Sequence, residues 1–168
     1  MNTSSEAPPI LVAVDFSDYS EAALVWAAKT AYQSSANLLV LHVVHDPASS
    51  PGHYAQRYAK GSPKKALRRL EEAATEMLAT FMDGCSERHP DLSALADART
   101  ILVIGIPSSR IIQVAKREGA QQIVVGSQGR TGLARLLLGS KAQRVAQLSP
   151  VPVTIVKVPE DVKVPEES

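Results

Sequence analysis

The chain has 168 residues, enough for one α/β domain with a hydrophobic core, and its 18 basic and 17 acidic residues leave a formal net charge of +1. This balance excludes an overall field that would draw the chain to nucleic acid or to a membrane surface. Because the single cysteine cannot form an internal disulfide, and no apolar run reaches the ~20 residues of a membrane span, we expect a soluble, cytoplasmic protein.

The N-terminal segment predicts a tail, a strand and a helix. Residues 1–8 are small and polar, without the apolar run of a signal peptide, and we expect them to be disordered. Residues 10–14 form an almost wholly apolar run, which is typical of a parallel strand buried on both faces. Asp18 and Glu21 have the spacing of a capping box and predict the start of an alanine-rich helix that ends near Ser34.

A second strand and a second helix follow, separated by a long connection. Residues 38–44 predict a buried strand, and residues 45–62 then show no clear period. A connection of this length is typical of either a functional or a disordered loop, and both interpretations stay open. Ser62 and Pro63 suit an N-cap and a first helical residue, and apolar residues at helical spacing extend this helix to about Arg88.

The next segment repeats the alternation of strand and helix. Residues 99–105 predict a third strand, and residues 123–125 predict a fourth. Between them, Pro107 opens a helix and Gly119 closes it, the usual positions of these two residue types at helix ends.

The C-terminal segment predicts a short helix, an edge strand and a tail. Ser140 and Gln143 have capping-box spacing at the start of a helix that ends at Leu148. Residues 151–156 predict a fifth strand, and two prolines at its start, which cannot donate ladder hydrogen bonds, predict that it lies at the edge of the sheet. Residues 158–168 form a charged tail.

The order of these elements predicts the fold class. Five strands that alternate with four helices indicate an α/β protein with a single open, doubly wound parallel sheet and right-handed crossovers. Such sheets bind ligands at the carboxyl ends of their strands. That rule directs attention to Asp15, Val43 and Gly126, which follow or end the first, second and fourth strands.

A glycine-rich loop joins the fourth strand to the last helix. Four of the nine glycines lie between Gly126 and Ser140, where they let the backbone approach a ligand without an intervening Cβ. The loop ends at a helix start, where free N–H groups and the helix dipole favour phosphate. The chain has neither the Gly-Lys pair of a P-loop nor a Gly-x-Gly dinucleotide fingerprint, so a different nucleotide loop is indicated.

The glycine spacing resembles a known family. Gly126, Gly129, Gly139 and Ser140 form the pattern Gly, two residues, Gly, nine residues, Gly, Ser/Thr, which is the signature of ATP-binding universal stress proteins. The first strand and helix, Leu-His-Val at residues 41–43 and Gly-Ile-Pro at residues 105–107 also resemble that family. The resemblance covers about residues 9–157 and implies one universal stress protein domain of the adenine nucleotide alpha-hydrolase-like fold, with strand order 3-2-1-4-5.

The resemblance also implies a set of site residues. The acid that ends strand one contacts the nucleotide, apolar positions line the adenine pocket, and the loop holds the phosphates. By its chemistry such a carboxylate can accept from ribose hydroxyls or hold Mg²⁺ through water, and a role as an N-terminal helix cap stays open beside these. In this chain the matching residues are Ala13, Asp15, Val43, Val125, Gly126, Gly129, Arg130, Gly139, Ser140 and Lys141. No catalytic residue and no protein metal site are assigned, and His42 is expected to be a satisfied, partly buried histidine.

The function expected from this reading is an ATP-binding regulatory protein of the stress response, acting through nucleotide-dependent conformation or partner binding. Similar proteins form homodimers through the fifth strand, here Val151–Val156, and we expect the same. Two alternatives stay open: a nucleotide-independent dimeric scaffold, and a weak ATPase or autophosphorylating protein. An adenylating enzyme is disfavoured because no glycine follows the first strand at residues 15–18.

Overall fold

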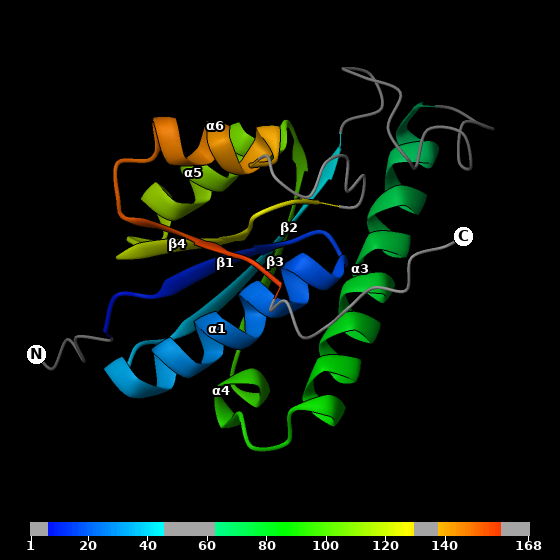
Figure 1. Ribbon diagram of the computed structural model, residues 1–168. Helices are drawn as coiled ribbons and strands as arrows, with labels where there is room; N and C mark the ends of the chain where they lie inside the picture. The colour runs from blue at the N-terminus through cyan, green and yellow to red at the C-terminus, as the bar shows by residue number, and fades with distance from the viewer. Residues whose placement is uncertain (1–6, 46–62, 130–137, 159–168) are drawn as a thin grey trace, which may run out of the picture.

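The computed structural model describes residues 7–45, 63–129 and 138–158 (Figure 1). Within these ranges the chain forms five strands and five helices. In chain order they are β1 (Ile10–Val14), α1 (Asp18–Ser34), β2 (Leu38–His45), α3 (Pro63–Arg88), α4 (Ser93–Ala96), β3 (Arg99–Gly105), α5 (Pro107–Arg117), β4 (Gln122–Gly126), α6 (Ser140–Leu148) and β5 (Val153–Val156). Most of the predicted tails and of the long connection after β2 lie outside the described residues.

The five strands form one parallel sheet in the order β3-β2-β1-β4-β5. The predicted fold class, the strand order and the edge position of β5 are therefore confirmed. The described residues contain one helix more than the four predicted, because α4 is a further helix of four residues. A single turn is too short to show helical periodicity in a sequence, although its Leu95 is buried in the core.

Two helical layers cover the sheet, and side-chain alternation along the strands separates them. In β1, Ile10 and Val12 belong to a core cluster with buried residues of α1, α3 and α4, whereas Leu11 belongs to a cluster with α5 and α6. Figure 1 shows α5 and α6 on one face and the other helices on the opposite face. Since successive strand residues point to opposite faces, a strand between two layers must be apolar throughout.

The N-cap of the first helix, α1, lies one residue earlier than the sequence predicts. Ser17, not Asp18, is the N-cap: its hydroxyl accepts from the N–H of Ser20 at 3.2 Å and donates to Asp15 Oδ1 at 2.6 Å. The Asp15 carboxylate thus holds the Ser17 hydroxyl in the capping position. Asp18 lies in the first turn, where its negative charge interacts favourably with the positive end of the helix dipole.

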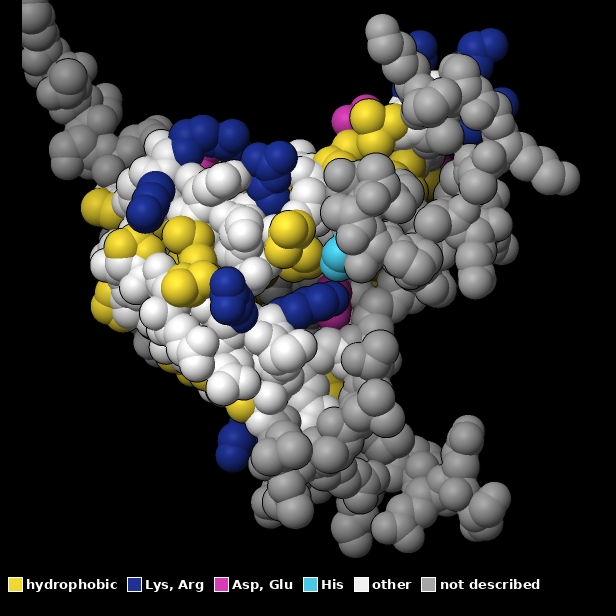
Figure 2. All heavy atoms as spheres, turned by 90° about the horizontal axis from the view of Figure 1, so that it is seen from above, with side chains coloured by type: hydrophobic (Ala, Val, Ile, Leu, Met, Phe, Trp, Pro, Cys, Tyr) yellow, Lys and Arg dark blue, Asp and Glu magenta, His cyan; other side chains and the backbone are white. Residues whose placement is uncertain are grey.

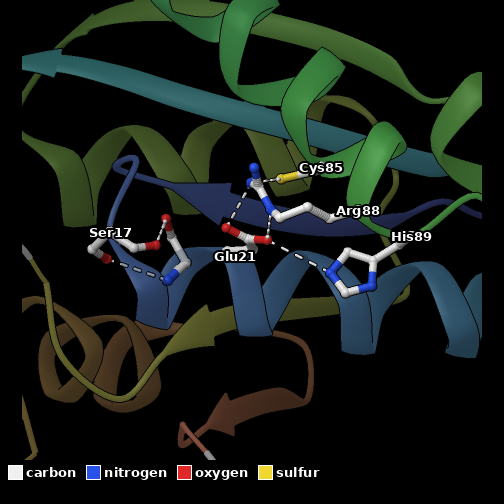
Figure 3. Close-up of polar contacts among 6 residues, drawn as sticks. Ser17, Glu21, Cys85, Arg88 and His89 are labelled. Atoms are coloured by element: carbon white, nitrogen blue, oxygen red, sulfur yellow. Dashed lines mark hydrogen bonds and ion pairs between the residues drawn. The ribbon is translucent and has the colours of Figure 1, made fainter. Parts of the chain in front are cut away.

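Glu21 does not close a capping box but joins α1 to the end of α3 (Figure 3). Arg88 donates to both of its carboxylate oxygens, at 2.7 and 2.9 Å, and His89 Nε2 lies 3.6 Å from Oε1. The hydrogen bond to Glu21 raises the pKa of the Arg88 guanidinium. Arg88 also donates to Cys85 Sγ at 3.7 Å, so the pair lies directly over the buried thiol.

The predicted bounds of α6 are confirmed, but its predicted cap and the predicted start of β5 are not. Gly139 is the N-cap of α6, without a side-chain cap, so the expected capping box of Ser140 and Gln143 is wrong. The Gly139 N–H donates to the Ser127 carbonyl at 2.8 Å, which fixes where the helix begins. The fifth strand begins at Val153, two residues late, and the Pro152 carbonyl before it accepts from the β4 backbone.

The two signals predicted at the ends of α5 are confirmed. Pro107 occupies the first turn, and Gly119 follows the helix with φ +63°, a left-handed conformation that glycine adopts without strain. The Gly119 N–H donates to the Lys116 carbonyl at 3.3 Å and the Ala120 N–H to the Ala115 carbonyl at 2.9 Å. These are the two bonds of a Schellman motif, and they turn the chain towards β4.

The buried cysteine gives a test of the contact between α1 and α3. Burial, together with the negative charge of Glu21, raises the pKa of the Cys85 thiol from 9.0 to about 11. A raised pKa favours the neutral thiol, so at pH 8 the thiolate fraction in the folded protein falls about a hundredfold, and burial of the sulfur slows attack further. We expect a thiol reagent to label the native chain at least a hundredfold more slowly than the urea-unfolded chain. Equal labelling rates would contradict the packing described for Cys85.

Candidate functional site

A cavity of about 400 Å³ lies at the carboxyl ends of the central strands, between the sheet and the layer of α5 and α6. The structure brings nine of the ten predicted site residues to its wall; the tenth, Arg130, lies outside the described residues. The nine are Ala13, Asp15, Val43, Val125, Gly126, Gly129, Gly139, Ser140 and Lys141. Residues from three separate strands and one helix start therefore converge on one space, as expected for an open α/β sheet.

The inner wall of this cavity is apolar. The strands contribute Ala13, Leu41, Val43 and Val125, which face α5 and α6. The helices contribute Pro107, Ile111, Ala142 and Val145, none of which the sequence predicts as a site residue. Their place on the cavity wall depends on how α5 and α6 pack on the sheet.

The polar rim is built around Asp15. Its Oδ1 accepts from both the N–H and the hydroxyl of Ser17, at 3.2 and 2.6 Å, and these contacts fix the carboxylate at the mouth of the cavity. The backbone of Gly129 lies so close that a Cβ there would be 2.7 Å from Asp15 Oδ2. The second glycine of the motif therefore makes room for the protein's own acid.

The first and last glycines of the motif allow close backbone contacts. A Cβ at Gly126 would lie 2.8 Å from the carbonyl carbon and oxygen of Tyr19, so this glycine lets the end of β4 approach the first turn of α1. A Cβ at Gly139 would lie 3.2 Å from the Ser127 carbonyl oxygen. The Ser127 N–H in turn donates to the Val156 carbonyl at 2.7 Å, which attaches the base of the loop to β5.

Next to Asp15, the backbone adopts an unusual conformation. Phe16 has φ +67°, in the left-handed region that bulky residues rarely occupy. Its ring stacks on His42 with centroids 4.2 Å apart and meets Phe81 of α3 at 5.5 Å. His42 is 4% exposed, and its Nδ1 donates to the Val14 carbonyl at 2.8 Å, because a carbonyl oxygen can only accept. The expected hydrogen bond is present, and the histidine is buried more fully than expected.

The start of α6 brings a positive charge to the cavity. Lys141 is exposed in the first turn of α6, where the free N–H groups and the helix dipole also favour an anion. Figure 2, which looks down on the layer of α5 and α6, shows a hollow in which basic, acidic and histidine side chains lie together. Within the described ranges, no group of three or more histidine, cysteine or acidic residues is arranged to hold a metal ion.

Among the described residues, no helix is long and apolar enough to span a membrane.

The predicted residues meet in the pocket, which has an apolar slot, an acid and a basic helix start along its wall. This combination suits a ligand with a flat apolar part and an anionic part.

Comparison with known sequences gives a consistent result. The family described as the universal stress protein family matches residues 7–157. The chain is 33% identical over 158 residues to universal stress protein YxiE of Bacillus subtilis, covering 88% of this chain and 97% of that protein. It is 30% identical over 148 residues to a universal stress protein of Thermus aquaticus, with the same two coverages.

Solved structures share the fold. Universal stress protein UspA from Lactobacillus plantarum superposes with a TM-score of 0.67 at 25% identity, covering 90% of this chain and 99% of that one. A universal stress protein in complex with cAMP has a TM-score of 0.58 at 24% identity, covering 91% and 98%. One from Archaeoglobus fulgidus in complex with dAMP has a TM-score of 0.59 at 23% identity, covering 90% and 99%.

The two glycines of the loop that lie next to α1 and Asp15 should differ in their tolerance of a methyl group. Gly126→Ala places a Cβ against the rigid backbone of Tyr19, and we expect a loss of about 2 kcal/mol in the free energy of unfolding. Gly129→Ala places it against one side-chain oxygen of Asp15, which can shift more easily than backbone although its contact with Ser17 opposes the shift, and we expect a loss of about 1 kcal/mol or less. Urea denaturation of both variants checks this order, and a larger loss for Gly129→Ala would contradict it.

Proposed function

The chain belongs to the universal stress protein family, and on that premise we propose that it binds ATP in the pocket at the carboxyl ends of β1, β2 and β4. In this proposal the bound nucleotide sets a conformation or a partner surface, and the protein acts as a regulator in the stress response. The observation that carries the proposal is the pocket itself, which joins an apolar slot to a glycine-lined helix start. The complexes of related proteins with cAMP and dAMP, both adenine nucleotides, support it.

Each end of the pocket suits one part of the nucleotide. The apolar slot beside Ala13, Val43 and Val125 suits a flat base. Backbone groups can form hydrogen bonds with the polar edge of that base. Asp15, fixed by Ser17, can accept from ribose hydroxyls or hold Mg²⁺ through water. When bound, Mg²⁺ would supply charge neutralisation for the phosphates.

The phosphates belong to the other end in this proposal. Gly126 and Gly129 would run along the ribose and the first phosphate, and the distal phosphates would meet the free N–H groups at Gly139, Ser140 and Lys141. The absence of a side-chain cap on α6 favours this assignment, because no side chain at the N-cap competes with an anion for those N–H groups. Arg130, which the family resemblance adds to the set, remains a sequence-based assignment.

Binding of ATP and the part played by Lys141 are tested together. Calorimetry with ATP and Mg²⁺ should detect binding to the wild type, and Lys141→Ala should weaken ATP about fivefold while changing AMP less, since an exposed ionic contact contributes about 1 kcal/mol. Arg144→Ala is the matched control, because Arg144 is exposed on the same helix but does not line the pocket. No binding of ATP or AMP to the wild type would overturn the proposed function.

We also propose that two copies of the chain pair through β5. This strand is at the edge of the sheet, its side chains are only partly buried, and an apolar edge strand favours pairing with another chain. A cytoplasmic location is part of the same proposal, supported by the free thiol of Cys85.

The dimer proposal predicts a sedimentation result. The wild type should sediment at twice the 17.9 kDa mass of one chain. Val153→Arg, in β5, should shift the protein towards the monomer, because two like charges would face each other across the pair. Thr100→Arg, at an exposed position of the opposite edge strand β3, should leave the dimer intact. Loss of the dimer in Thr100→Arg but not in Val153→Arg, with both variants folded by circular dichroism, would refute pairing through β5.

A further inference from the structure

His45 is the last residue of β2, and it lines the pocket. Side chains two residues apart on a strand share a face, so His45 follows Leu41 and Val43 along the same wall. Its neighbour on the next strand is Gly105 of β3. His45 therefore stands at the β3 side of the pocket, away from the loop.

The position relative to the loop is set by the sheet. Gly126 ends β4, and β1 lies between β4 and β2. Two strand spacings of about 4.8 Å separate His45 from the glycine side of the pocket, roughly 10 Å across the sheet. A ligand with its phosphates at α6 would thus bring its base, not its phosphates, towards His45.

The wall around His45 is otherwise apolar. On this side the lining residues Leu41, Val43, Pro107 and Ile111 have no polar side-chain atom. His42 also lines the pocket, but its ring stacks on Phe16 and its Nδ1 is bonded to the Val14 carbonyl. The imidazole of His45 is thus the polar side chain that the described part of this wall offers to a base. Backbone groups can also bind a base, but a substitution tests only the contribution of a side chain.

One ring nitrogen of His45 has no hydrogen-bond partner among the described residues. Its Nδ1 is buried and makes no hydrogen bond to any described residue. His42, three residues earlier on the same strand, satisfies its own Nδ1 on the Val14 carbonyl. Buried polar groups without a partner are rare and costly, and at a binding pocket a ligand commonly supplies the partner. Because Nδ1 has almost no exposed surface, the imidazole must rotate before this nitrogen can meet a ligand in the pocket.

We propose that His45 is a specificity-determining residue that accepts a hydrogen bond from the exocyclic amine of the adenine base. The proposal rests on the proposed function, since it needs a nucleotide in this pocket with its phosphates at α6. A neutral imidazole nitrogen without a proton is an acceptor, and the 6-amino group of adenine is a donor. A site that pairs with such a group discriminates against a base that lacks it.

The test compares ATP with purine riboside 5′-triphosphate, which lacks only the amine, by calorimetry on the full chain. The wild type should bind ATP about tenfold more tightly than the analogue. His45→Leu preserves most of the side-chain volume, and in this variant the ratio should fall towards one through loss of ATP affinity alone. His45→Gln, which keeps an acceptor oxygen, should restore part of the ratio. His89→Leu, a histidine at the end of α3 that does not line the pocket, should behave as the wild type.

The outcomes separate the two proposals. An unchanged tenfold ratio in His45→Leu would overturn the role of His45 while leaving nucleotide binding in place. Equal weakening of both nucleotides would also overturn it, because His45 would then be a general wall contact. If the wild type binds neither nucleotide, the proposed function fails, and the role of His45 fails with it.

Discussion

The hydrogen bond between the Asp15 carboxylate and the Ser17 hydroxyl, 2.6 Å long, joins the pocket to the helical layer. The same hydroxyl caps α1, so the direction of the helix and the orientation of the acid are set by one contact. From that start, α1 reaches the close backbone contact with Gly126 at Tyr19 and carries Glu21 to Arg88 of α3. A change at Asp15 would therefore alter helix capping as well as the rim of the pocket, and the two effects must be measured separately in any variant.

Phe16, which lies between Asp15 and Ser17 in the sequence, has a backbone conformation that costs about 1 to 3 kcal/mol for a side chain of its size. Its ring packs between His42, which lines the pocket, and Phe81 of α3. This packing offsets the strain. The unfavourable backbone angle and the favourable ring contacts occur in the same residue. Strain held by surrounding structure is common at binding sites, where it pre-organises neighbouring groups.

The fold could be predicted from the sequence because its signals are redundant. Apolar runs such as residues 10–14, Pro107 at one helix start and Gly119 at its end each predict the observed element independently. The errors occurred where two neighbouring residues could perform the same role. Ser17 and Asp18 are both good N-caps, and the choice depends on the Asp15 contact; Gly139 displaces Ser140 because its N–H is held by Ser127. No motif in the sequence places Ile111 or His45 on a cavity wall, because that position depends on how α5 and the end of β2 pack around the pocket.

The bond from the Ser127 N–H to the Val156 carbonyl places the base of the glycine loop next to the outer strand of the sheet. One backbone hydrogen bond thus connects the glycine loop of the pocket to β5. If occupancy of the pocket strengthens pairing of two chains along that strand, thermodynamic reciprocity requires that pairing strengthens occupancy by the same factor. Local protein concentration would then tune the response of such a protein to its ligand, without a separate effector site.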